Sequence, residues 1–312
     1  MMIDDNGYVL VIGSAGIDVK GTPLGEVAHG VASDGRIRNS VGGVARNIAE
    51  MLARLEIPIV LLSAVGDDDE GERVIEACEA VDIDCDSLLV VEDARTGTNF
   101  ALMSPSGQVD IALIDMEIMQ EVDTEYLLEN EDLFEDAAMI VIDATLSPAS
   151  LKTVFELAKK YNVRVCADPT TPSLAGRLCE FMSQLYLVVP NAAETTVLCG
   201  LQDPARDRDT AIAAARKLVS MGAKIAVVTV GEQGLSYADS SGGGFVKAKK
   251  VHVVDATGAG DALGAAIIFG ILNDIAIDDA MTLGVGAAAI TLQTPDTVPT
   301  DLNPETLYDM LS

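Results

Sequence analysis

The chain of 312 residues is poor in the residue types that build metal clusters, disulfides and membrane anchors. It has two histidines, no tryptophan and five cysteines, and no two cysteines form a C-x-x-C pair. This pattern argues against a zinc site and a disulfide framework, and we interpret the cysteines as reduced packing residues. The longest apolar run, residues 262–272, is shorter than the ~18 residues that cross a bilayer. We therefore expect no membrane partner.

Positive charge is also scarce. Lys and Arg number 20 against 49 Asp and Glu, which gives a formal net charge of −29. Such a surface repels phosphate backbones, so we expect no nucleic-acid partner. It can hold an anionic substrate only where local groups overturn the field, such as the N–H groups at a helix start. The first residues are acidic where a secretory signal is basic, which favours a cytoplasmic protein.

Short β-branched runs alternate with longer segments of helical period along most of the chain. This alternation is typical of βαβ units and predicts an α/β fold, with a mostly parallel central sheet flanked by helices. The predicted strands are residues 8–13, 57–64, 138–143, 164–168, 185–190 and 225–230, and the predicted helices are residues 44–55, 151–158, 211–221 and 261–272.

Two insertions, at about residues 19–39 and 96–114, interrupt this alternation. Both contain strand-like stretches, and in the second these flank the turn-forming residues 104–107. Because open α/β sheets bind ligands at their carboxyl edge, we predict that the insertions form a small β lid there. Peripheral decoration without a function is the alternative.

The segment from residue 255 to residue 261 carries the most chemical information. Its small residues Gly258, Ala259 and Gly260 leave the first N–H groups of the next helix unobstructed, so that they can receive negative charge. We call these N–H groups the anion hole. Asp261 lies in the first turn and can accept the proton of a hydroxyl that attacks phosphorus. An ordinary helix start capped by Thr257 explains the same spacing equally well.

Other glycine-rich phosphate sites are not supported. The chain has no G-x-x-x-x-G-K-[ST] motif, so a P-loop NTPase is not supported. Residues 13–16, after the first predicted strand, do not supply a dinucleotide fingerprint, which argues against a dehydrogenase.

Five motifs, in chain order, resemble those of the ribokinase-like (PfkB) carbohydrate kinases. They are residues 16–18, 42–47, 190–194, 229–234 and 255–261. The resemblance covers nearly the whole chain. It implies one ribokinase-like three-layer domain over residues 1–312, with the lid as its smaller part. The implied activity is the ATP-dependent transfer of a phosphoryl group to an alcohol.

The resemblance also implies roles on the acceptor side of the site. Asp261 would be the catalytic base, and the anion hole would hold the transferred phosphoryl group. The residues implied to hold the ribose hydroxyls are Asp18, Gly42, Gly43 and Asn47. Thr98 and Asp115 are the lid candidates for recognising a base.

On the nucleotide side, the resemblance implies ATP and Mg²⁺. The residues implied to contact ATP are Asn191, Thr229, Gly231, Gly234 and Thr257. Glu194 would hold Mg²⁺ through water. Asp255 resembles the start of a loop that binds a monovalent cation such as K⁺. Residues 293–296 depart from the ribokinase pattern that completes this K⁺ site.

The expected substrate is a small molecule. Val44 and Ala45 stand where ribokinase-type chains have Lys and Gly, which disfavours free ribose. Within the family, the resemblance implies the 5′-hydroxyl of a nucleoside as the acceptor. A kinase for a different nucleoside or for a free sugar is the alternative, and a non-catalytic sensor with the same fold is a second one. Lid strands with an apolar edge also favour a homodimer that pairs through the lid.

Overall fold

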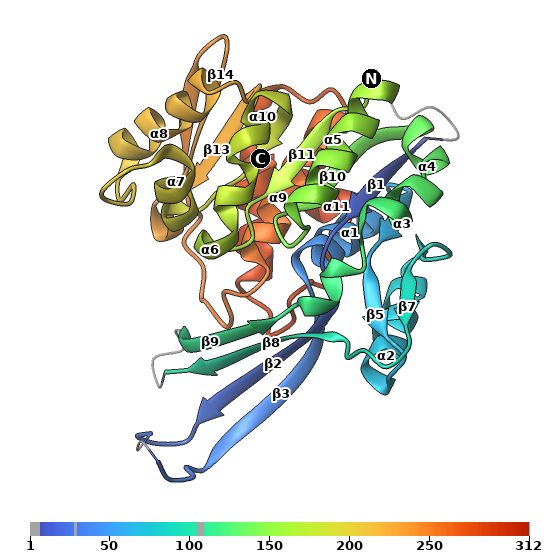
Figure 1. The fold of residues 1–312 in the computed structure, drawn as a ribbon. Coiled ribbons are helices and arrows are strands. Elements are labelled where there is room, and N and C mark those ends of the chain that lie inside the picture. Colours follow the sequence, from blue (N-terminus) through green and yellow to red (C-terminus); the bar gives the residue numbers. More distant parts are fainter. Residues whose placement is uncertain (1–6, 28–29, 105–108, 312) are drawn as a thin grey trace.

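The computed structural model describes residues 7–27, 30–104 and 109–311. Its centre is a nine-stranded sheet (Figure 1), in which the seven strands from β13 to β6 run parallel and β14 and β15 are antiparallel. In sheet order the strands are β15 (Gly243–Lys247), β14 (Gly234–Asp239), β13 (Ile225–Thr229), β12 (Leu185–Val188), β11 (Val165–Asp168), β10 (Ala137–Asp143), β1 (Tyr8–Ile12), β4 (Ile59–Leu62) and β6 (Ile83–Asp84). The six predicted strands are confirmed within a few residues.

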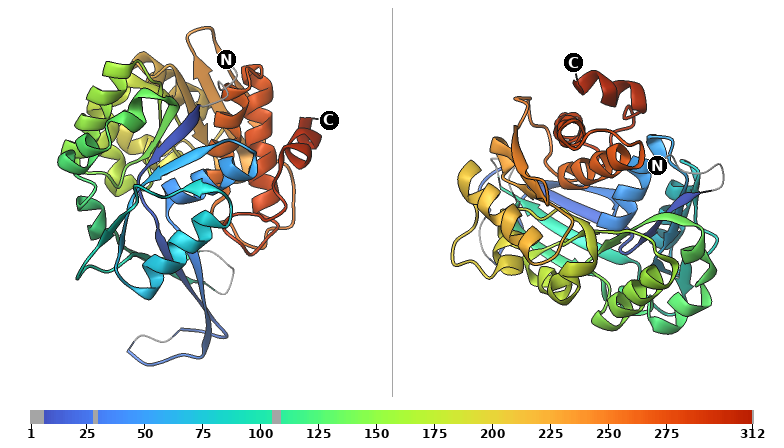
Figure 2. Two further views of the ribbon diagram at one scale, coloured as in Figure 1. Left: turned by 90° about the vertical axis from the view of Figure 1, so that its right-hand side faces the viewer. Right: turned by 90° about the horizontal axis from the view of Figure 1, so that it is seen from above.

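Helices cover both faces of this sheet, so the predicted three-layer α/β fold is confirmed. Successive residues of a strand point to opposite faces. Accordingly Val9 and Val11 of β1 join one apolar core, while Leu10 and Ile12 join the other. The first core is covered by α1 (Val44–Arg54), α2 (Asp69–Glu79), α9 (Ala259–Leu272), α10 (Ile277–Thr291) and α11 (Pro304–Tyr308). The second is covered by α3 (Thr124–Glu129), α4 (Asp132–Glu135), α5 (Pro148–Tyr161), α6 (Pro172–Ala175), α7 (Ala192–Cys199) and α8 (Arg208–Ser220) (Figure 2).

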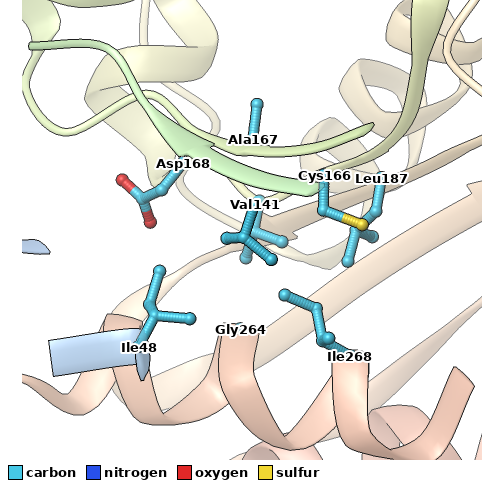
Figure 3. Close-up of a pocket in the computed structure, with 9 residues that line it drawn as sticks. Ile48, Val141, Cys166, Ala167, Asp168, Leu187, Gly264 and Ile268 are labelled. Atoms are coloured by element: carbon cyan, nitrogen blue, oxygen red, sulfur yellow. The ribbon is translucent and has the colours of Figure 1, made fainter. Parts of the chain in front are cut away.

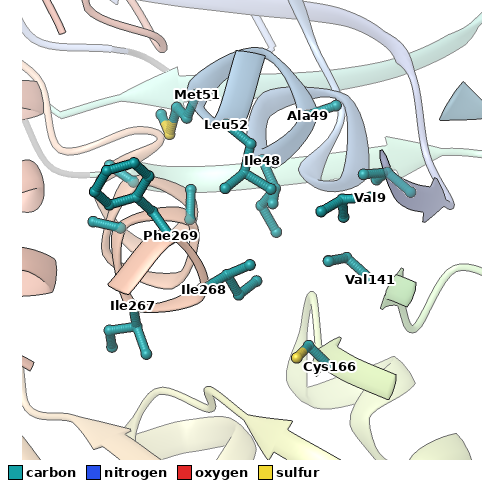
Figure 4. Close-up of a cluster of buried hydrophobic side chains, with 14 of the residues drawn as sticks. Val9, Ile48, Ala49, Met51, Leu52, Val141, Cys166, Ile267, Ile268 and Phe269 are labelled. Atoms are coloured by element: carbon teal, nitrogen blue, oxygen red, sulfur yellow. The ribbon is translucent and has the colours of Figure 1, made fainter. Parts of the chain in front are cut away.

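Helix α9 is the central helix of the first core. Every residue from Asp261 to Leu272 is buried, because the helix is apolar on all sides and packs against the sheet, α1 and α10. Figure 4 shows its residues Ile268 and Phe269 beside Met51 and Leu52 of α1. The start of α9 is therefore fixed by packing, which gives the residues of its first turn a rigid support.

A second sheet of four strands leaves the body where β1 ends. Its order is β3 (Gly35–Gly42), β2 (Gly16–Pro23), β8 (Gly97–Met103) and β9 (Val109–Asp115), and we call it the lid sheet. Strand β2 begins four residues after the last residue of β1, so the lid sheet starts at the carboxyl edge of the main sheet (Figure 1). Both predicted pairs of strands are antiparallel, as expected of hairpins. Of the predicted turn at residues 104–107, residues 105–107 lie outside the described part of the chain.

The two faces of the lid sheet differ in chemistry. Asp18 and Lys20 alternate with apolar neighbours along β2, and their partners across the sheet are polar or small: Ser40 and Arg38 on β3, Asn99 and Ala101 on β8. The opposite face carries Val19, Phe100 and Leu113 in one row and Ile37, Leu102 and Ile111 in the next. Ile37 and Leu113 are 76% and 66% exposed. The lid sheet therefore has a polar face and an exposed apolar face.

Glycines form the rung at which the lid sheet joins the body. Gly42, Gly16 and Gly97 are direct neighbours across β3, β2 and β8. A Cβ atom on Gly16 would lie 2.2 Å from the carbonyl oxygen of Gly97, so a side chain there would push the two strands apart.

Smaller features complete the fold. Strands β5 (Ala64–Gly66) and β7 (Leu89–Val91) form a separate two-stranded parallel sheet. All five cysteines are free, and three are buried as expected of packing residues. Cys179 is exposed, so the packing interpretation is wrong for it. Within the described ranges, no helix has both the length and the apolar character that a membrane span requires.

Candidate active site

The carboxyl ends of neighbouring parallel strands bring polar residues to one edge of the main sheet. Asp143 ends β10, Asp168 ends β11, Asn191 follows β12 and Thr229 ends β13. These strands are adjacent in the order β13, β12, β11 and β10, so the four side chains belong to one row at this edge. Open parallel sheets bind their ligands here.

Asp261 is buried in the first turn of α9, close to this edge. The amide Nδ2 of Asn47, from α1, donates a hydrogen bond of 2.8 Å to its Oδ2 atom. Burial raises the pKa of Asp261 to about 7, the bond from Asn47 opposes this, and the carboxylates of Asp18, Asp143 and Glu194 add to the rise. A carboxyl group that ionises near neutral pH suits a general base.

The residues predicted to form the anion hole lie at the start of α9. Gly258 is the N-cap, with a φ of 79° and no side-chain cap, so the alternative of a helix capped by Thr257 is wrong. A Cβ atom on Gly258 would lie 2.2 Å from the carbonyl oxygen of Thr297, which leaves room for glycine alone. The N–H of Ala259 makes one long bond, 3.4 Å to the oxygen of Ala256. Three further N–H groups find no acceptor among the described residues: Gly258, Gly260 and Asp261.

The predicted acceptor residues surround the junction of β2, β3 and α1. Asp18 is buried and accepts a bond of 3.1 Å from Nδ2 of Asn99. Burial raises the pKa of Asp18, against the bond from Asn99. A Cβ atom on Gly42 would lie 2.5 Å from the Asp18 carboxyl carbon, and Gly43 has a φ of 96° at the start of α1. Asn47 follows one turn later and donates to Asp261, so Asp18 and Asp261 both lie near the start of α1.

The structure does not bring Thr98 and Asp115 to this place. They are partners of each other across β8 and β9, and the alternation of β8 puts Thr98 on the opposite face from Asn99. Asn99, which the sequence analysis missed, is the residue that pairs with Asp18. The period of two along the predicted strand was the signal that could have found it.

Asp143 is a second residue that the sequence analysis missed. Its buried carboxylate accepts bonds from the N–H of Ser14 at 2.8 Å, from Oγ of Ser14 at 2.5 Å and from the N–H of Ala45 at 3.2 Å. It also accepts a bond of 2.9 Å from the N–H of Thr145. This carboxylate ties the end of β10 to the turn before β2 and to the start of α1. An acid at the end of an apolar strand was the available signal.

The predicted nucleotide residues lie beside one another after β12 and β13. Asn191 and Glu194 form a capping box at the start of α7, in which Glu194 accepts bonds of 2.8 Å and 2.6 Å from the N–H and Nδ2 of Asn191. Asn191 also pairs with Thr229 as an isolated parallel bridge. Gly231 and Gly234 have positive φ angles of 53° and 118° in the turn that follows. The turn and the capping box together offer a polar surface at the same edge.

Comparison with known proteins identifies the family. The pfkB family carbohydrate kinases match residues 6–303. The chain belongs to this family. The pseudouridine kinase of Escherichia coli is 29% identical over 300 residues, which are 96% of this chain and 95% of that protein. The guanosine-inosine kinase of Exiguobacterium acetylicum is 26% identical over 283 residues, 90% of this chain and 93% of that protein.

Solved structures agree on the fold. Arabidopsis thaliana ribokinase complexed with ribose and ATP has a TM-score of 0.85 at 20% identity and covers 98% of this chain and 99% of its own. A ribokinase II of E. coli in complex with ATP and Mg²⁺ has a TM-score of 0.83 at 18% identity, with coverage of 98% and 99%. The chain is thus a PfkB kinase of ribokinase-like fold, a phosphotransferase that acts on an alcohol group, and kinases of this family use ATP and Mg²⁺.

The acids of this PfkB kinase suit a magnesium ion held largely by phosphates and water. Burial and the nearby carboxylates of Asp261 and Glu194 raise the pKa of Asp168 well above its usual value. Yet within the described ranges no three acidic, histidine or cysteine side chains are grouped as a metal site. Mg²⁺ prefers oxygen ligands and keeps several waters. Both Glu194 oxygens already accept bonds from Asn191, so a Mg²⁺ ion at this edge would be held by Glu194 through water rather than directly.

A small cavity lies beside Asp168, between β11 and α9. Its volume is about 10 Å³, room for a single water. Apart from Asp168 the labelled side chains around it are apolar, among them Ile48, Val141 and Ile268 (Figure 3). It is a packing void of the core rather than a place for a substrate.

A monovalent cation does not fit at Asp255 as this carboxylate stands. The ammonium of Lys20, from the lid sheet, donates to Oδ2 of Asp255 at 2.6 Å, and the N–H of Thr257 donates to Oδ1 at 2.9 Å. Burial raises the pKa of Asp255, but the bonds from Lys20 and Thr257 outweigh it and the pKa is lowered overall. Both oxygens are therefore engaged, and a positive charge already lies against the carboxylate.

Proposed function

We propose that this PfkB kinase transfers the γ-phosphoryl group of ATP to the 5′-hydroxyl of pseudouridine, giving pseudouridine 5′-phosphate and ADP. The observation that carries the kinase reaction is Asp261, buried, fixed by Asn47 and adjacent to N–H groups without acceptors. The choice of acceptor is supported by the similarity to the E. coli pseudouridine kinase over 96% of the chain.

The proposed mechanism is direct in-line transfer without a covalent enzyme intermediate. Asp261, as the carboxylate, removes the proton of the 5′-hydroxyl while that oxygen attacks phosphorus. Asn47 keeps the carboxylate oriented through its bond to Oδ2. The proton that Asp261 takes up neutralises a charge that is costly to bury, which is consistent with its raised pKa.

The N–H groups of Gly258, Gly260 and Asp261 stabilise the charge that develops on the transferred group. Preorganised donors of this kind contribute more than any other single effect in many enzymes, because they need not reorient during the reaction. A protein with a net charge of −29 repels the phosphates of ATP. These N–H groups counter that repulsion, because backbone dipoles attract phosphate where few basic side chains are available.

The acceptor is proposed to lie between Asp18 and Asp261, with its ribose hydroxyls on Asp18. A buried carboxylate accepts hydrogen bonds from two hydroxyl groups well and disfavours an analogue that lacks them. The polar face of the lid sheet, which carries Asp18 and Asn99, would cover the acceptor and exclude water, the competing nucleophile.

An ADP-release assay over five acceptors tests the proposal: pseudouridine, uridine, inosine, ribose and fructose. Uridine is the strictest comparison, because it differs from pseudouridine only in the glycosidic bond. We expect the highest kcat/KM with pseudouridine, and ³¹P NMR of the product should show a 5′-monophosphate. Asp261→Asn provides the background rate. Equal or better turnover of any competitor would reject pseudouridine, and inosine would then be the first candidate, given the guanosine-inosine kinase among the relatives.

A homodimer through the lid sheet is part of this proposal. The exposed apolar rows that include Ile37, Ile111 and Leu113 lie on the face away from Asp18. A second copy of the same sheet would cover them without blocking the polar face, since isologous pairing joins identical patches.

A further inference from the structure

Two basic side chains of the lid sheet reach the two loops beside the anion hole. Lys20 binds Asp255, three residues before Gly258. Arg38, its direct partner across β2 and β3, donates to the carbonyl oxygen of Pro295 at 2.9 Å and to the carboxylate of Asp296. One rung of the lid sheet thus contacts loops that are 40 residues apart in the chain.

These two loops also hold each other. The N–H of Val254 donates to the carbonyl oxygen of Leu292 at 2.8 Å, and Gly258 packs against the backbone of Thr297. The position of the anion hole therefore depends on this pair of loops, and the charge of Asp255 lies next to the N–H groups that must attract phosphate. An uncompensated carboxylate there would repel the phosphoryl group.

We propose that the Lys20 ammonium is a built-in cation, which neutralises Asp255 and orders the anion-hole loop in place of a dissolved monovalent ion. Phosphoryl transfer by this kinase then does not depend on K⁺. The inference rests on the proposed kinase reaction but not on the choice of acceptor.

The surroundings of Lys20 favour this role over that of a surface ion pair. Its side chain is 12% exposed and that of Asp255 is 17% exposed, whereas the Arg38–Asp296 pair is almost half exposed on both sides. Exposed pairs contribute little because water and salt screen them, and a largely buried pair is screened much less. A tethered ammonium also carries the same single charge as K⁺ without depending on its concentration.

The position of Lys20 adds a positioning effect that a free ion would lack. Lys20 and Asp18 are two residues apart on the same face of β2, so the strand that carries the proposed acceptor ligand also carries the cation. Placement of the lid sheet and order in the anion-hole loop are therefore coupled through one short segment of backbone.

The test compares wild type with Lys20→Met, Lys20→Arg and Arg38→Met. ADP release is measured in K⁺, NH₄⁺, methylammonium or tetramethylammonium at constant ionic strength, with whichever acceptor of the panel is turned over. We expect wild type, Lys20→Arg and Arg38→Met to vary less than about twofold among the cations. Lys20→Met should lose about tenfold or more in tetramethylammonium, as expected for a broken buried pair, and should recover with at least one small cation.

Arg38→Met is the matched control, because it removes the neighbouring charge of the same rung. Activation of the wild type by K⁺, or failure of every small cation to rescue Lys20→Met, would overturn the proposal. Thermal unfolding gives a second measurement that needs no acceptor: only Lys20→Met should be stabilised by a small cation relative to tetramethylammonium. If wild type turned over none of the acceptors, the proposed function would fail while this measurement still decided the role of Lys20.

Discussion

The start of α9 and the lid sheet carry the two principal acids of the candidate site, Asp261 and Asp18, and they differ in how firmly the rest of the protein supports them. Asp261 belongs to a helix that is buried throughout and packed between the sheet, α1 and α10. Asp18 belongs to a sheet that projects from the body and has one face exposed. A proton acceptor must be held within fractions of an ångström, so rigid support suits it. An acceptor must be able to enter and leave the site, and the lid sheet offers it a binding surface at the edge of the body.

The two regions also treat charge differently. Near the start of α9, burial raises the pKa values of Asp168, Glu194 and Asp261. For Asp168 and Asp261, neighbouring carboxylates add to the rise. In the lid sheet, acid and base alternate, with Asp18 and Lys20 side by side on one face. Clustered buried acids create a group poised to take up a proton, whereas paired opposite charges create a stable contact.

The sharpest way to break this comparison is to remove the base. Asp261→Asn should lower kcat by about 10² or more, as expected when a general base is lost, while acceptor affinity stays nearly unchanged. The amide can still accept the bond from Asn47, so the fold should be retained. Steady-state kinetics and calorimetric binding of the acceptor measure the two effects. A kcat close to that of the wild type would remove Asp261 from the mechanism.

Asp18 and Asp115 offer a matched pair within the lid sheet. Asp18→Asn should lower kcat/KM for the acceptor by about 10- to 100-fold, since buried charge-assisted hydrogen bonds to the hydroxyls are lost. The KM for ATP should change little. Asp115→Asn, on the opposite face, should change kcat/KM by less than about twofold. A large effect of Asp115→Asn with a small effect of Asp18→Asn would reverse the assignment of the two faces.

The pH dependence of kcat/KM tests whether Asp261 ionises near neutral pH. In the proposed mechanism Asp261 acts as the carboxylate, and burial raises its pKa to about 7. Activity should therefore level off above pH ~7 and fall about tenfold per pH unit below it. An acid limb near pH 4 would mean that the carboxylate is not perturbed in solution.

The apolar face of the lid sheet should affect assembly more than chemistry. Replacing both Ile37 and Leu113 by Asp is expected to convert a homodimer into a monomer, because charges would be buried in the pairing face. Light scattering measures the mass, and kcat should stay within about twofold of the wild type. A wild-type monomer would exclude pairing through this face.

Much of the fold could be predicted because local patterns decide it. The apolar runs at residues 8–13 and 138–143 are buried on both faces, and the resulting lack of alternation already indicated a parallel sheet. The helix at 44–55 follows from apolar spacing alone. The strand pairs of the lid were also predicted, but the side chains were not assigned to its two faces. Thr98 was therefore named as a ligand contact, although its neighbour Asn99 is the residue that donates to Asp18.

The candidate site was predicted in part because its residues cluster in motifs. The anion hole follows from small residues at a helix start, a local feature. Contacts between distant segments could not be deduced in this way. Nothing near Asp255 indicates Lys20, which lies 235 residues away, and nothing near Asp143 indicates the turn of Ser14. Such pairings depend on strand order and on the path of the lid, which only the folded chain defines.

The distance between the glycine rung and Lys20 determines how far a tilt of the lid sheet moves the Lys20 ammonium. Lys20 is four residues beyond Gly16, which is about 13 Å along an extended strand. A tilt of about five degrees at that rung displaces the ammonium by roughly 1 Å, enough to separate it from Asp255 at such spacing. The three glycines therefore lie at the level of the lid sheet from which even a small tilt would separate Lys20 from Asp255.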